Sequence, residues 1–102
     1  MSPYRHMELR IDRLLARAAR HRDAPAAVEM EDLLATGYAY ALQGDARCRR
    51  LRRRVDELAE DVAAESAAVE MLRLAREQRA LEDSTRLLRT RLEAVRTLLM
   101  EA

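Results

Sequence analysis

One apolar repeat, built of alternating steps of three and four residues, runs for more than forty residues and passes over two glycines. Spacing of about 3.5 residues keeps one face of a helix against a partner helix. Because Gly37 and Gly44 keep the phase of this repeat, we expect them inside a helix, as small positions that another helix approaches closely. The alternative, a helix end at Gly44 with an N-cap at Asp45, would normally reset the phase. The predicted contact residues of this first seam are Leu34, Gly37, Ala41, Gly44, Leu51, Val55, Leu58 and Val62.

A second apolar repeat begins near Met71 and is out of phase with the first. The change of phase rotates the apolar face by more than about 90°. Either one continuous helix presents two faces, or the chain turns back near residues 63–68. We prefer a hairpin in which paired residue numbers sum to about 136, because Gly44 then meets Leu92 and Gly37 meets Leu99, small against large. The predicted contact residues of this second seam are Leu74, Leu81, Leu88, Leu92, Val95 and Leu99.

A shorter amphipathic pattern at about residues 3–21 predicts a first helix, which ends before Pro25. The apolar stripe of the last helix widens toward its C-terminal end, so the first helix is expected to pack there. The prediction is one all-α domain over residues 1–102. It is a long antiparallel coiled-coil helical hairpin, with helices at about 25–64 and 68–101, and the short N-terminal helix lies on one end, making three helices.

Composition excludes several classes of protein. All 19 basic residues are Arg, so Schiff-base lysine chemistry and a lysine-containing phosphate loop are excluded. The single Cys48 excludes a disulfide within the chain and favours a reducing, cytoplasmic location. No apolar stretch approaches the roughly 18 residues of a membrane span. No grouping of nucleophile, base and carboxylate suggests catalysis. We therefore predict no enzyme activity, no catalytic residues, no cofactor and no metal.

Charge is strongly segregated along the chain. Residues 46–55 carry six arginines and no acid, and residues 56–70 carry six acids and no base. The predicted hairpin would bring Arg86 and Arg89 opposite Arg50 and Arg47, with few acids nearby. Guanidinium groups bind phosphates and carboxylates in pairs, although a solvated helix face is the simpler interpretation. The predicted anion- or partner-binding residues are Arg47, Arg49, Arg50, Arg52, Arg53, Arg54, Arg86 and Arg89.

These features favour a non-enzymatic protein–protein interaction module, an adaptor or regulatory subunit that binds another protein through its helical faces. The hairpin end away from the first helix would be only two helices thick, so Val69 and Leu72 are expected to be covered by a second copy or another partner. We therefore expect a possible homodimer. The alternative is a regulator or sensor whose Arg cluster binds a phosphate-bearing ligand or nucleic acid. Steep salt dependence of binding would favour that alternative.

Overall fold

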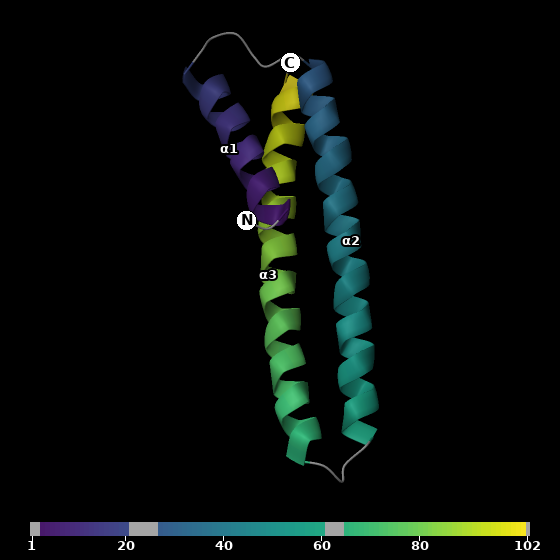
Figure 1. The fold of residues 1–102 in the computed structure, drawn as a ribbon. Coiled ribbons are helices and arrows are strands. Elements are labelled where there is room, and N and C mark those ends of the chain that lie inside the picture. The colour runs from purple at the N-terminus through teal and green to yellow at the C-terminus, as the bar shows by residue number, and fades with distance from the viewer. Residues whose placement is uncertain (1–2, 21–26, 61–64, 102) are drawn as a thin grey trace.

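The computed structural model describes residues 3–20, 27–60 and 65–101, and all of these residues are helical. The helices are α1 (Pro3–Arg20), α2 (Ala27–Glu60) and α3 (Glu65–Glu101). Helices α2 and α3 run antiparallel along the whole rod, and α1 lies along one half of it (Figure 1). The rod measures 63 × 18 × 17 Å. The predicted all-α hairpin with a short N-terminal helix is confirmed, and the continuous single helix is excluded.

The ends of the helices differ slightly from the predicted ones. Helix α2 ends at Glu60 rather than near residue 64, and α3 begins at Glu65 rather than near residue 68. The predicted seam residue Val62 lies outside the described residues. Helix α2 passes through both glycines without a break, and neither glycine has a positive φ. A helix end at Gly44 is therefore excluded.

The register of the hairpin differs from the predicted one by seven residues. Gly37 lies against the side chain of Leu92, and Gly44 lies against Thr85 and Tyr4. The predicted pairs Gly37–Leu99 and Gly44–Leu92 are therefore wrong. A shift of seven residues is one full apolar repeat, so the same faces of α2 and α3 meet in both registers.

The core lies in the half of the rod that has three helices. Amphipathic α1 places an apolar residue over the α2–α3 groove at nearly every turn, which closes this half to solvent. We call it the proximal half, and the remainder, toward the α2–α3 connection, the distal half. The buried core residues are Met7, Ile11 and Leu14 of α1, Met30, Leu33 and Ala41 of α2, and Leu88, Leu92 and Val95 of α3.

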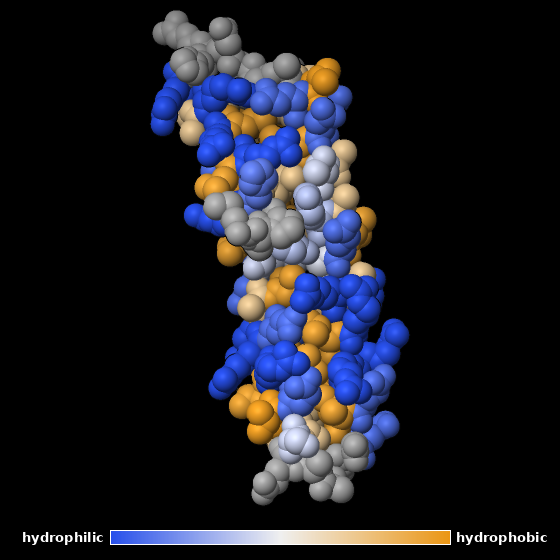
Figure 2. Space-filling model, viewed as in Figure 1, coloured by the Kyte–Doolittle hydropathy of each residue, from blue (hydrophilic) through white to orange (hydrophobic). Residues whose placement is uncertain are grey.

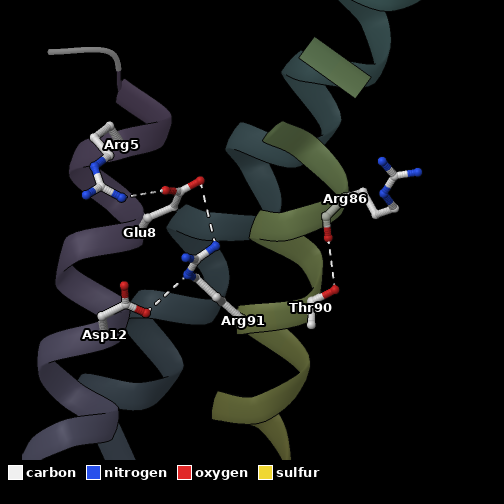
Figure 3. A network of polar contacts seen from close by, with 6 residues as sticks. All are labelled: Arg5, Glu8, Asp12, Arg86, Thr90 and Arg91. Carbon is white, nitrogen blue, oxygen red and sulfur yellow. Dashed lines mark hydrogen bonds and ion pairs between the residues drawn. The ribbon is translucent and has the colours of Figure 1, made fainter. Parts of the chain in front are cut away.

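Polar contacts also hold α1 on the hairpin. The Tyr4 hydroxyl donates to the carbonyl of Tyr40 at 3.0 Å. Arg91 of α3 points toward α1, where its Nε is 3.1 Å from Asp12 and its Nη1 is 3.8 Å from Glu8 (Figure 3). Glu8 is 9% exposed and also accepts a bond from Arg5. These contacts fix where α1 begins, which is opposite Gly44, near the middle of the rod.

Candidate functional site

The eight arginines of the predicted cluster lie on more than one face of the rod. Arg86 of α3 points away from α1, whereas Arg91, five residues later, points toward it (Figure 3). We call the face that carries α1 the front and the opposite face the rear. A rear groove of about 620 Å³ includes four of the predicted arginines. It is lined by Asp45, Cys48, Arg49, Arg52, Glu82, Thr85, Arg86, Arg89, Thr90 and Glu93.

A front groove of about 600 Å³ lies beside the first turn of α1. It contains two other arginines of the predicted cluster, Arg47 and Arg50, together with one acid and apolar residues of α3. Its lining is Tyr4, Tyr40, Gln43, Arg47, Arg50, Glu77, Ala80, Leu81 and Ser84. Arg50 and Arg86, predicted to lie opposite each other, therefore line different grooves.

The expectation of few acids near the cluster is wrong. Glu77 of α3 lies 2.6 Å from Arg47, and Glu82 lies 3.6 Å from Arg52. The predicted register placed Glu77 opposite residue 59, outside the Arg-rich segment, and Glu82 opposite residue 54, at its end. The seven-residue shift sets them beside the Arg-rich segment of α2. Much of the positive charge is therefore compensated within the hairpin itself.

Other arginines of the cluster pair within one helix or have no ion pair. Arg86 pairs with Asp83, one turn earlier in α3. Arg54 lies 3.3 Å from Glu57. Among the described residues, Arg49, Arg50 and Arg53 form no ion pair. Anion binding by these residues stays a prediction.

In the rear groove, an ion pair with two hydrogen bonds joins Asp45 of α2 to Arg89 of α3. Arg89 donates from Nη1 to Oδ1 of Asp45 at 3.1 Å and from Nη2 to Oδ2 at 2.5 Å. A forked pair of this kind is stronger and more directional than a single contact. The hydrogen bonds from Arg89 hold the pKa of the Asp45 carboxyl below its ordinary value.

This lowered pKa predicts a loss of stability in acid. The folded state holds the Asp45 proton less tightly than the unfolded state, whose carboxyl has a pKa of about 3.9. The contribution of the pair is present above that pH and is lost as pH falls through the lower folded-state value. We expect Asp45→Asn to lose less stability than the wild type between about pH 5 and pH 2. Urea denaturation at several pH values measures this, and parallel curves for the two proteins would contradict it.

The single thiol of the chain, Cys48, lies in the rear groove. Burial raises the pKa of the Cys48 thiol, so the thiol is protonated at neutral pH and is a poor nucleophile. No group of three or more His, Cys, Asp or Glu side chains among these residues is placed to hold a metal ion. Tyr4, which lines the front groove together with Tyr40, was not predicted as a site residue. Its position depends on how α1 docks, which no local pattern in the sequence encodes.

The apolar seam is less covered in the distal half. Proximal Leu88, Leu92 and Val95 are fully buried. In the distal half Leu74 is buried, at 6% exposed, whereas five other large apolar residues of the seam are only half-buried. Figure 2 shows apolar side chains along the middle of the distal half, with hydrophilic side chains on both sides. We call these five residues the distal seam: Leu51, Val55, Leu58, Met71 and Leu81.

Two further apolar side chains are exposed near the same end of the rod. Val69 is 70% exposed and Leu72 is 54% exposed. Large apolar side chains that are exposed among charged residues are typical of protein contact sites. None of the described helices combines the length and apolar character needed to cross a membrane.

No family model, curated protein or solved structure matches this chain.

Proposed function

We propose that the protein is a non-enzymatic protein–protein interaction module, an adaptor or regulatory subunit, whose docking surface is the distal seam. The observation that carries this proposal is the contrast in burial along one continuous seam. Leu88 is fully buried under α1, whereas Leu81, one repeat away on the same helix, is half-buried. A cytoplasmic location, favoured by the single cysteine, belongs to the same proposal.

The apolar surface that α1 leaves uncovered in the distal half would be stabilised by a partner that covers it. Covering apolar surface contributes about 25 cal/mol per Å², and α1 supplies that cover only as far as Tyr4. Beyond Tyr4 the front groove continues between α2 and α3 with Ala80 and Leu81 in its wall. A partner helix laid there would extend the packing that α1 makes in the proximal half. The charged margins would then set the orientation of the partner.

A protein partner explains the grooves better than a phosphate-bearing ligand does. The rear groove contains Asp45, Glu82 and Glu93 as well as its four arginines. A phosphate there would meet carboxylates, and it would have to replace ion pairs that α2 and α3 already make. Nucleic acid would meet the same obstacle along the rod. Mixed charges of this kind are typical of protein surfaces that pair with other proteins.

Site-specific photo-crosslinking in the native host tests the docking surface. A photoreactive amino acid at Leu81 is expected to capture a protein partner, because this residue lies in the front groove of the distal half. The matched control is Leu42, which is 64% exposed in the same rod. Capture at position 81 without capture at position 42 would support the proposal. No adduct at 81, or equal adducts at both positions, would contradict it.

A further inference from the structure

We propose that the front groove of the distal half binds one amphipathic helix of a partner protein, and that an acidic side chain of this helix pairs with Arg50. This inference rests on the proposed function and states the chemistry of the partner. The helix lies in line with α1 and continues the cover that α1 gives to the proximal half. The partner therefore combines an apolar face, directed into the groove, with acidic residues on the margin that faces α2.

Helix α1 shows how a helix binds between α2 and α3. Its middle is apolar, and three of its apolar residues are buried at successive turns. The margin of α1 that faces α3 carries acids, because Glu8 and Asp12 both contact Arg91 (Figure 3). The margin that faces α2 carries a base, since Arg17 lies 2.5 Å from Glu29. A bound helix is therefore matched to the groove by its apolar face and by the sign of charge on each margin.

The sign of the charge on both walls reverses in the distal half. On α2, Arg50 follows Glu29 by three heptads, so the two residues share one face of the helix. On α3, Glu77 precedes Arg91 by two heptads and shares its face in the same way. Both Arg50 and Glu77 line the front groove. A helix bound there needs an acid on the margin where α1 carries Arg17.

Arg50 is the charge on this wall that is left for a partner. The arginines one turn before and after it on α2 are already paired, because Arg47 lies 2.6 Å from Glu77 and Arg54 lies 3.3 Å from Glu57. Arg50 is exposed and forms no ion pair among the described residues. A guanidinium group binds a carboxylate through two parallel hydrogen bonds. At the margin of an apolar contact, such a pair determines which partner binds and how it is oriented.

The uncovered part of the groove has the length and the walls that a helix requires. The described part of α2 beyond Gly44, residues 45–60, is about 24 Å long at a rise of 1.5 Å per residue. A helix of about sixteen residues covers this length, and α1 itself has 18 residues. On the α3 wall Ala80 and Ser84 lie one turn apart beside Leu81. Because their side chains are small, a helix can approach α3 closely and cover Leu81.

The test compares two neighbouring arginines that line opposite grooves. The probe is the full chain with a photoreactive amino acid at Leu81, expressed in the native host. Arg50→Glu sets a carboxylate against the acidic margin of the partner helix, so the yield of the adduct should fall about tenfold. The matched control is Arg49→Glu, which makes the same change of charge at an exposed residue of the rear groove. Its adduct yield should equal that of the wild type, and circular dichroism should show that both variants keep their helices.

Mass spectrometry of the adduct identifies the captured segment of the partner. This segment should be an amphipathic helix, and replacing its acid nearest the crosslink by Arg should restore capture by the Arg50→Glu protein. Equal yields from the Arg50→Glu and Arg49→Glu proteins, a captured segment without an acid, or no restoration by the compensating change would overturn the inference. In each of these cases capture at position 81 without capture at position 42 would still support the proposed function. The two proposals therefore fail separately.

Discussion

Replacing Gly44 by Leu is expected to lower the free energy of unfolding by about 3 kcal/mol, the upper end of the usual cost of overpacking a core. A Cβ atom at this position would lie 2.5 Å from the Thr85 hydroxyl and would also clash with the hydroxyl of Tyr4. Both hydroxyls are held in place: Thr85 donates to the carbonyl of Leu81 at 2.8 Å, and Tyr4 donates to the carbonyl of Tyr40. Neither can move aside without losing a hydrogen bond.

The result runs against helix propensity, which makes it informative. In an exposed helix interior, removing a glycine normally stabilises the helix by about 0.5–1 kcal/mol. The matched control is Ala39→Leu, at an exposed position of the same helix, where the change should be within about 0.5 kcal/mol. Urea denaturation measures both variants. Gly44→Leu with unchanged or increased stability would show that Tyr4 and Thr85 do not enclose this position.

The second large loss of stability is expected when the side chain of Leu88 is truncated. Truncation to Ala is expected to cost about 2–5 kcal/mol, because the side chain is fully buried and the helices can close the cavity only in part. The matched variant is Leu81→Ala, one repeat earlier on the same helix. There the side chain is half-buried, and the cost should be about 1 kcal/mol.

This comparison should be made by urea denaturation at one protein concentration for both variants and the wild type. Equal losses at positions 88 and 81 would show that the two halves of the rod are equally well packed.

Much of the fold could be predicted from the sequence because helical periodicity is a local property. The repeat through Gly37 and Gly44 predicted that α2 continues past both glycines. The change of phase near Met71 left either one helix with two faces or a hairpin, and the hairpin was preferred because the two seams fit each other in size. The predicted second seam includes Leu88, Leu92 and Val95, and all three are fully buried. These predictions need only the knowledge of which residues share one face of a helix.

The register, and with it the candidate site, was decided only by the tertiary structure. A heptad pattern is unchanged by a shift of seven residues, so pairing Gly37 with Leu92 or with Leu99 buries the same kinds of surface. The two registers differ in which side chains fill the space beside the glycines. In the structure Leu92 fills the space at Gly37, and Tyr4 of α1 fills the space at Gly44. That choice also places Glu77 beside Arg47 and Asp45 beside Arg89. Periodicity determines which faces meet, but the level at which they meet depends on contacts between residues far apart in the chain.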